Sequence, residues 1–103
     1  MLTSKQRAYL KSLANPLDTI LMVGKGGVTA QVIQQGDEAL EARELIKGKV
    51  LETAPEAARE TAEAIARAVN GELVQVIGSK FVLYRPRKKN PEIQLPPSRE
   101  RRG

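Results

Sequence analysis

The chain of 103 residues contains no cysteine, no histidine and no tryptophan. Without cysteine it can form neither disulfides nor thiolate metal sites. Without histidine it lacks the commonest metal ligand and the usual general base. No Gly-Lys-Ser/Thr phosphate-binding motif is present either. We therefore expect no metal, no cofactor, no small-molecule substrate and no enzymatic activity.

Long apolar runs are also absent. No segment is long and apolar enough to span a bilayer, and residues 1–5 lack the apolar core of a signal peptide. We therefore expect a cytoplasmic protein with no membrane partner. The length predicts one domain that buries roughly 65% of its unfolded surface, which is enough for one modest core.

The basic charge is unevenly distributed. The chain carries 17 basic and 12 acidic residues, a net charge of +5. Six of the basic residues but two of the acids lie in residues 86–103, which therefore hold +4 of that charge. Four prolines interrupt the same segment. This composition predicts a disordered basic tail over 87–103 that either follows a polyanion or only solubilises the protein.

Hydrophobic periodicity and capping signals predict three helices and four strands in the order α-β-α-β-α-β-β. Thr3 or Ser4 caps the first helix, Thr29 caps the second, and Thr53-Ala54-Pro55-Glu56 fits a capping box for the third. Asn70-Gly71 is typical of a helix end. The predicted helices cover 4–14, 29–44 and about 53–70, and the predicted strands cover 18–23, 45–51, 73–77 and 80–85.

This order predicts an α/β fold, a two-layer sandwich in which helices cover one face of a mixed four-stranded sheet. A type II′ turn at Gly78-Ser79 would pair Val76 with Phe81 and Val74 with Leu83, and these four side chains would face the helices. The other face would stay open around Ile77, Val82 and Tyr84. An adaptor that docks a protein on this open face is one functional hypothesis.

The segment Gly24-Lys25-Gly26-Gly27 follows an apolar strand and precedes a helix. Its glycines free the backbone for positive φ and for close approach to a ligand. The helix start behind it offers unpaired N–H groups to an anion, and Lys25 adds a positive charge. The segment suits a phosphate, as in the GxxG loop of KH domains. A simple tight turn is the alternative interpretation.

The same residues carry a family resemblance. The runs Val23–Thr29, Glu44–Lys47, Val74–Gly78 and Val82–Pro86 resemble the YhbY proteins, the stand-alone bacterial form of the CRM domain of chloroplast RNA splicing and ribosome maturation. The resemblance extends from about Leu2 to Pro86, which predicts a domain over 1–86. Arg43 and Gly48 depart from it, since we expect a histidine and a β-branched residue there.

The resemblance implies an RNA-binding fold similar to the C-terminal domain of translation initiation factor three. It also implies a link to precursors of the large ribosomal subunit, and contact with RNA through the GxxG loop. Aromatic residues are limited to Tyr9, Phe81 and Tyr84, so recognition of RNA backbone or shape is favoured over base stacking. Charge alone leaves DNA open as the ligand. We expect a monomer whose RNA-binding residues are Gly24, Lys25, Gly26, Gly27, Thr29, Lys5, Lys11, Lys47, Lys49, Lys80, Arg85, Arg87, Lys88 and Lys89.

Overall fold

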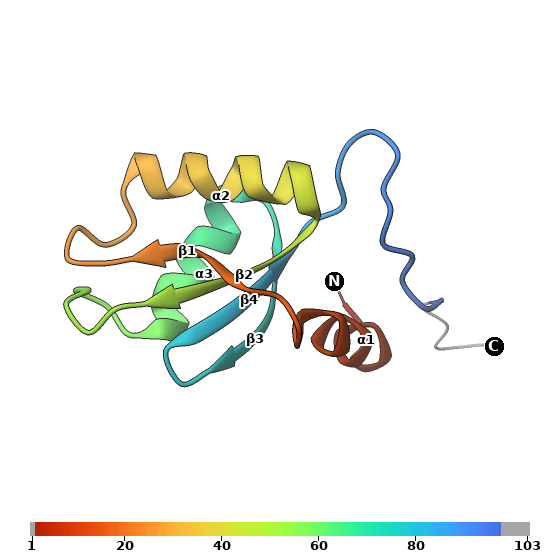
Figure 1. Cartoon of the computed structure of the whole chain (residues 1–103), viewed down its shortest axis with the longest axis horizontal. Coiled ribbons are helices and arrows are strands. Elements are labelled where there is room, and N and C mark those ends of the chain that lie inside the picture. Colours follow the sequence, from red (N-terminus) through yellow and green to blue (C-terminus); the bar gives the residue numbers. More distant parts are fainter. Residues whose placement is uncertain (1, 98–103) are drawn as a thin grey trace.

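The elements of the fold follow in the predicted order. A computed structural model describes residues 2–97 (Figure 1). Its helices and strands are α1 (Ser4–Ala14), β1 (Thr19–Val23), α2 (Ala30–Arg43), β2 (Leu45–Val50), α3 (Ala58–Val69), β3 (Glu72–Ile77) and β4 (Lys80–Tyr84). The predicted α-β-α-β-α-β-β order is confirmed. Within residues 2–97, no helix has the length and apolar character needed to cross a bilayer.

The four strands form one mixed sheet in the order β1-β2-β4-β3. β1 and β2 pair in parallel, while β4 pairs antiparallel with both β2 and β3. The central strand β4 is buried on both faces, because Phe81, Val82, Leu83 and Tyr84 are each at most 5% exposed. The predicted mixed four-stranded sheet is therefore confirmed.

The sequence predicted that all helices cover one face of the sheet, and this prediction is wrong. α2 and α3 cover one face, where Ile65 of α3 packs in a core with Phe81 and Leu83. α1 packs on part of the opposite face, where Leu10 and Ala14 lie in a second core (Figure 1). Successive side chains of β4 point to opposite faces of the sheet and so contribute to both cores. The face around Val82 and Tyr84, which the sequence predicted to be open, is covered by α1. The second core also includes Leu45, Val74, Val82 and Tyr84.

A bulge in β3 explains why one predicted pairing is wrong. Val76 pairs with Phe81 as predicted, but the register then shifts and Leu83 pairs with Leu73 instead of Val74. Val74 turns into the α1 core as a result. The Arg7 guanidinium of α1 donates hydrogen bonds to the carbonyls of Leu73 and Val74, at 2.6 and 2.9 Å. A β-bulge twists a strand and leaves backbone groups outside the ladder, and Arg7 satisfies two of them.

The third helix begins later than its sequence signal predicts. Thr53 forms no capping box, since α3 starts at Ala58 and has no side-chain cap. The chain is held in a turn before the helix, with the Leu51 N–H bonded to the Val23 carbonyl and the Ala54 N–H bonded to the Leu51 carbonyl, at 2.8 and 3.0 Å. Tertiary contact with the end of β1 thus overrides a local capping preference.

The other caps form as predicted. Thr3 and Gln6 make a reciprocal capping box on α1, and the Thr29 hydroxyl accepts the Val32 N–H on α2. Asn70 takes the left-handed conformation at the end of α3. Gly78 has a φ of +58° at the hairpin turn, and Ser79 does not have a positive φ, which fits the predicted type II′ turn.

Gly48 has a packing reason. A Cβ built on Gly48 would overlap the ring of Phe81, which crosses β2 at this point. The large ring fills the space that a β-branched residue would occupy. The departure from the family pattern is therefore compatible with a packed core.

Candidate nucleic-acid interface

Residues 24–27, here called the glycine loop, form a tight turn that projects from the end of β1. The Gly27 N–H donates to the Gly24 carbonyl at 2.9 Å, and this bond leaves Lys25 and Gly26 exposed at the tip. Gly27 alone among the three loop glycines has a positive φ, +71°. It is buried against Pro55, whose Cγ would lie 2.9 Å from a Cβ at this position. Only one of the glycines is therefore required by backbone conformation.

Helix α2 begins just behind the glycine loop with its positive end exposed. The exposed Thr29 caps the helix by accepting the Val32 N–H at 3.1 Å, and the first turn of α2 contains no acidic residue. No carboxylate of that turn therefore offsets the positive end of the helix dipole, which favours an anion. Lys25 adds a mobile positive charge at the same end.

The sheet places two lysines beside two exposed apolar side chains on the face that carries α1. Its cross-strand register aligns Met22 with Lys49, Lys49 with Lys80, and Lys80 with Ile77, and we call these four residues the exposed row. Met22 is 56% exposed and Ile77 is 63% exposed, because α1 does not reach this half of the sheet. The exposed row thus offers positive charge on an otherwise flat apolar surface.

The glycine loop and the exposed row lie at the same end of the sheet. The Val50 N–H bonds to the Ser79 carbonyl at 2.7 Å and joins the end of β2 to the hairpin turn. In Figure 1 the glycine loop lies at the far left and the β3–β4 turn lies at the bottom, left of centre. The tertiary structure therefore pairs Lys49 with Lys80 and places the loop that carries Lys25 at the same end of the sheet.

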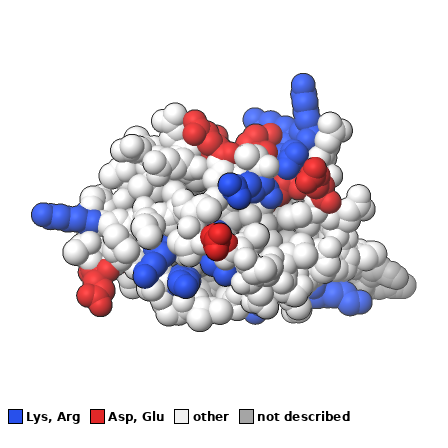
Figure 2. Space-filling view, viewed as in Figure 1, with Lys and Arg blue, Asp and Glu red and all other residues white. Residues whose placement is uncertain are grey.

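Charge is only partly segregated between the sheet and α2. In Figure 2 basic side chains cluster over the strands in the lower half of the molecule, while acidic and basic side chains are mixed at the top over α2. The C-terminal half of α2 includes Asp37, Glu38 and Glu41. A polyanion would therefore meet the sheet face and be repelled from the back of α2.

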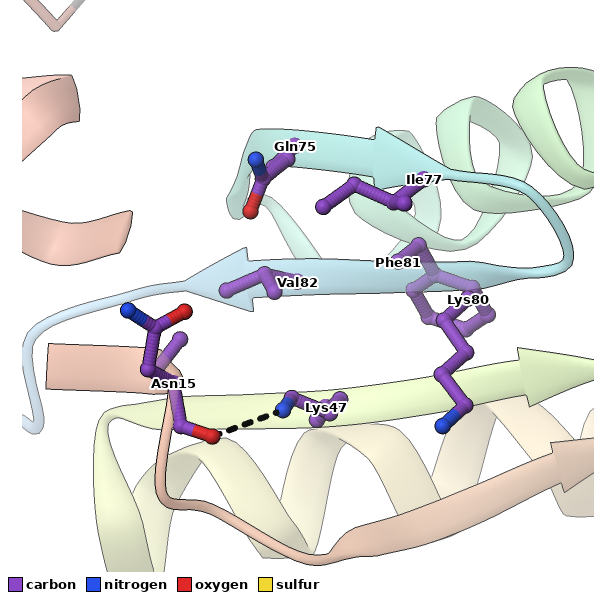
Figure 3. Close-up of a pocket in the computed structure, with 8 residues that line it drawn as sticks. Asn15, Lys47, Gln75, Ile77, Lys80, Phe81 and Val82 are labelled. Atoms are coloured by element: carbon purple, nitrogen blue, oxygen red, sulfur yellow. Dashed lines mark hydrogen bonds between the residues drawn. The ribbon is translucent and has the colours of Figure 1, made fainter. Parts of the chain in front are cut away.

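A small hollow lies between the end of α1 and the exposed row. It encloses about 100 Å³, with Ala14, Val82 and Ile77 among its apolar lining residues. The side chains of Asn15, Gln75, Lys47 and Lys80 also line it (Figure 3). Lys47 donates to the Asn15 carbonyl at 3.4 Å. Asn15 and Gln75 carry no charge or motif in the sequence, so no local signal could have identified them as site residues.

The lysines of α1 do not join this surface. Lys5 is exposed in the first turn of α1, and Lys11 is partly covered one turn and a half later. Figure 1 places α1 at the other end of the sheet from the glycine loop. Lys11 instead borders a depression with Arg7, Arg59 and Gln75 at the edge of β3.

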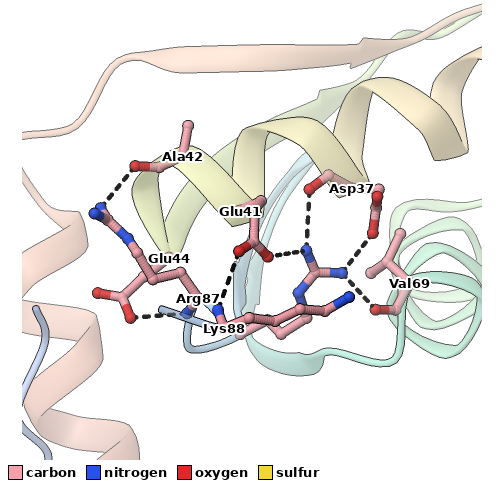
Figure 4. Close-up of polar contacts among 8 residues, drawn as sticks. Asp37, Glu41, Ala42, Glu44, Val69, Arg87 and Lys88 are labelled. Carbon is pink, nitrogen blue, oxygen red and sulfur yellow. Dashed lines mark hydrogen bonds and ion pairs between the residues drawn. The ribbon is translucent and has the colours of Figure 1, made fainter. Parts of the chain in front are cut away.

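Arg85 holds the fold together and is poorly placed for RNA. Its guanidinium donates to the Asp37 carboxylate at 2.6 Å, to the Val69 carbonyl at 2.8 Å and to Glu41 at 3.3 Å (Figure 4). The side chain is only 15% exposed. These bonds tie the end of β4 to both α2 and α3, so the structure gives Arg85 a different role from the one predicted.

Residues 87–97, here called the C-terminal segment, lie against the domain, which differs from the expected free tail. The Glu44 carboxylate accepts the backbone N–H groups of Arg87, Glu92 and Ile93 at 2.8–2.9 Å. Ile93 and Leu95 pack against the α1 core. The sequence did not predict these contacts, because a segment rich in proline and charge, such as the one around Pro86 and Pro91, has the composition of a disordered chain. Residues 98–103 of the predicted tail lie outside the described part of the chain.

Burial and hydrogen bonding act in opposite directions on Glu44. Burial alone would raise the pKa of this carboxyl, since its side chain has no exposed surface. The three backbone N–H donors and the Arg87 charge outweigh burial and lower the pKa below its ordinary value. Glu44 is therefore held as a carboxylate in the fold, and burial together with its charge raises the pKa of Tyr84 nearby.

The predicted basic residues therefore fall into three groups. Lys25, Lys47, Lys49 and Lys80 surround the exposed half of the sheet, while Lys5 and Lys11 lie on α1. The third group is Arg85, Arg87, Lys88 and Lys89. Arg87 is bonded to the Ala42 carbonyl and lies 3.8 Å from Glu92, whereas the side chains of Lys88 and Lys89 are exposed. Residues 2–97 contain no group of three or more acidic side chains arranged to hold a metal ion.

Comparison with known proteins gives consistent matches over nearly the whole chain. Residues 2–85 match the family described as the CRS1/YhbY (CRM) domain. The probable RNA-binding protein YqeI of Bacillus subtilis is 49% identical over 96 residues, which cover 93% of this chain and 100% of that protein. An RNA-binding protein of Haemophilus influenzae is 40% identical over 95 residues, which cover 92% of this chain and 95% of that protein.

A solved structure matches in fold and in sequence. The solution structure of the hypothetical protein SAV1595 from Staphylococcus aureus superposes with a TM-score of 0.78 at 51% identity. The match covers 93% of this chain and 100% of that one. This agreement extends the match from the sequence to the arrangement of helices and strands.

Proposed function

The chain belongs to the CRS1/YhbY (CRM) domain family, and from that membership we propose that it is an RNA-binding protein. The names of its relatives in Bacillus subtilis and Haemophilus influenzae support RNA as the ligand. The RNA contacts would be made by the glycine loop and the exposed row. Thr29 would add a contact beside the glycine loop, and Lys5, Lys11, Lys88 and Lys89 would add contacts elsewhere on the domain.

The observation that carries this proposal is the joint position of Lys25, Lys49 and Lys80 at one end of the sheet. The loop that carries Lys25 lies at the positive end of α2, whose first turn holds no acidic residue, and the acidic residues of α2 lie in its C-terminal half. Phosphate contacts of this kind supply affinity without reading sequence. The surface suits the backbone of a structured or single-stranded RNA.

We further propose that the RNA is ribosomal and that the protein acts, as a cytoplasmic monomer and without catalysis, in assembly of the large ribosomal subunit. The sequence resemblance to family members linked to large-subunit precursors supports this part of the proposal. Lack of histidine and cysteine is consistent with a binding role. Binding of precursor ribosomal RNA in preference to unrelated RNA would test it.

Most of the sheet face on which an adaptor would dock a partner protein is buried. Val82 and Tyr84 are each 5% exposed and lie in the α1 core, so they are unavailable to a partner protein. Ile77 stays exposed, but it lies beside Lys80 in the exposed row. The geometry therefore favours a polyanion over a second protein domain.

The test is a charge reversal at the glycine loop, Lys25→Asp with Gly26→Asp. Gly26 does not need a positive φ, and a Cβ there would meet only the Thr29 Cγ2 at 3.4 Å, so the variant should fold. We expect affinity for a large-subunit ribosomal RNA fragment to fall at least tenfold. Circular dichroism and thermal melting would verify folding.

The matched control makes the same charge change on the far helix, Arg67→Asp with Ala68→Asp. Both positions are exposed near the end of α3, away from the sheet face that carries the exposed row. We expect this control to retain most of its RNA affinity. If the loop variant stays folded and binds as tightly as the parent, the loop is only a turn and the proposal is wrong.

A further inference from the structure

The hollow beside α1 has a size that limits its occupant. Its volume of about 100 Å³ is well below the roughly 300–1,000 Å³ of sites that enclose a whole small-molecule ligand. Side chains of Ala14, Val82 and Ile77 give it an apolar interior next to the exposed row. It is suited to one flat apolar group that remains attached to something larger outside.

The rim of the hollow carries two primary amides with free hydrogen-bonding capacity. In the part of the chain that the structure describes, neither the Asn15 nor the Gln75 side chain hydrogen-bonds to the protein. Figure 3 places the two amides on opposite sides of Val82, one at the end of α1 and one on β3. Each amide offers both a donor and an acceptor, which is the combination that nucleobase edges accept.

The charge around the hollow indicates what the flat group is attached to. Lys47 and Lys80 line the same hollow, and Lys80 also belongs to the exposed row. An ammonium group attracts the phosphates of a strand that crosses the sheet, while the apolar interior accepts a ring from that strand. Charge complementarity and continuity with the proposed RNA surface therefore favour one occupant.

We propose that this hollow binds one unpaired nucleobase of the RNA, with Gln75 and Asn15 hydrogen-bonding to its edge and Lys47 and Lys80 contacting the neighbouring phosphates. The inference rests on the proposed RNA-binding function and makes it more specific. A paired base cannot enter, because its edge is occupied by its partner and its faces by stacking. The protein then binds loops, bulges or single strands in preference to uninterrupted duplex.

The experiment compares Gln75→Met with the parent chain on two RNA probes. Methionine keeps the length of the side chain and removes its amide, while β3 keeps its backbone pairing. The probes are an RNA hairpin with an unpaired loop and an uninterrupted duplex of similar length. We expect the variant to bind the hairpin about fivefold more weakly and the duplex unchanged, as expected for lost hydrogen bonds to one base.

The matched control is Gln35→Met, an exposed position on α2 that lies away from the sheet. A set of hairpins in which each loop nucleotide in turn lacks its base then locates the contact. One abasic hairpin should bind the parent about fivefold more weakly and show no further loss with Gln75→Met. The Gln75 side-chain NH₂ resonances should shift on hairpin binding, and those of Gln35 should stay in place.

Two results overturn the inference in distinguishable ways. If the parent and Gln75→Met bind the hairpin equally and the Gln75 resonances do not move, the hollow holds no base, although RNA binding through the glycine loop stands. If neither probe binds the parent at any salt concentration, the proposed function itself fails together with the inference.

Discussion

The Oε1 atom of Glu44 lies 2.9 Å from the backbone nitrogen of Ile93, 49 residues further along the chain. The same oxygen accepts the N–H of Glu92, and the other carboxylate oxygen accepts the N–H of Arg87. Glu44 itself has a positive φ of 68° between α2 and β2 and no exposed surface. One buried carboxylate thus fixes where the C-terminal segment leaves the sheet.

Replacing this carboxylate should destabilise the protein and free the C-terminal segment. In Glu44→Gln an amide NH₂ replaces one acceptor oxygen and faces a backbone donor. Loss of charge-assisted hydrogen bonds in a buried site is expected to cost about 1–3 kcal/mol of unfolding free energy. Urea denaturation would measure the cost, and amide exchange at Glu92 and Ile93 would report release of the segment.

The control for this variant is Glu52→Gln, which removes the same charge from an exposed position in the turn before α3. It should change stability by less than about 0.5 kcal/mol. Equal stability of Glu44→Gln and the parent, with unchanged exchange at Ile93, would contradict the role assigned to Glu44.

The same site predicts a loss of stability in acid. The pKa of Glu44 is lowered in the fold from its ordinary value of 4.5, which the unfolded chain recovers. Its contribution is therefore complete above pH 4.5 and is lost as the pH falls through the lowered, folded value. Unfolding free energies measured from neutral pH to well below 4.5 should fall less steeply for Glu44→Gln than for the parent. Parallel curves would assign the acid sensitivity to other carboxylates.

The glycine loop should tolerate side chains at one glycine and not at another. Gly27→Ala should cost about 1–3 kcal/mol, because Gly27 has a φ of +71° and a Cβ there would lie 2.9 Å from Pro55. Gly26→Ala should be nearly neutral, since Gly26 is exposed and its φ is not positive. Urea denaturation of the two variants gives the comparison, and a stable Gly27→Ala would show that the loop can relax.

RNA affinity should depend strongly on salt, and much of this dependence should come from the sheet lysines Lys49 and Lys80. Each phosphate neutralised contributes a slope of about −0.7 in log K against log salt for a single strand. In Lys49→Gln with Lys80→Gln the slope should be shallower by roughly one to two units. Arg67→Gln on α3 is the control and should leave the slope unchanged. An unaltered slope in the double variant would exclude the exposed row from the interface.

The order of elements was predictable because it depends on local physics. Alternating apolar residues, the Thr3 and Thr29 caps and the Gly78-Ser79 turn each act within a few residues, and the structure forms all of them. The glycine loop could also be predicted from the sequence, since three glycines and a lysine between a strand and a helix are a local pattern. The capping box at Thr53 failed because a distant contact, the bond of Leu51 to Val23, decided that turn.

Charge alone could not distinguish the exposed lysines of the sheet from arginines that are bonded within the fold. Arg85 and Lys80 look alike as basic residues near β4, yet only the fold puts Asp37 and Glu41 around Arg85. The bulge at Val74 could not be predicted either, because the local hydrophobic pattern of β3 fits both registers. Arg7, which lies on α1, hydrogen-bonds to the bulged backbone. Partners brought together from distant parts of the chain decide both cases.

By itself, the sequence determined the α-β-α-β-α-β-β order, the mixed sheet and the glycine loop, since periodicity, caps and turns encode these over short distances. The tertiary structure alone decided that α1 covers the second face, that Glu44 holds the C-terminal segment, and that Asn15 and Gln75 flank one hollow. These features depend on side chains far apart in the chain, and their free energies arise only when packing excludes water between them.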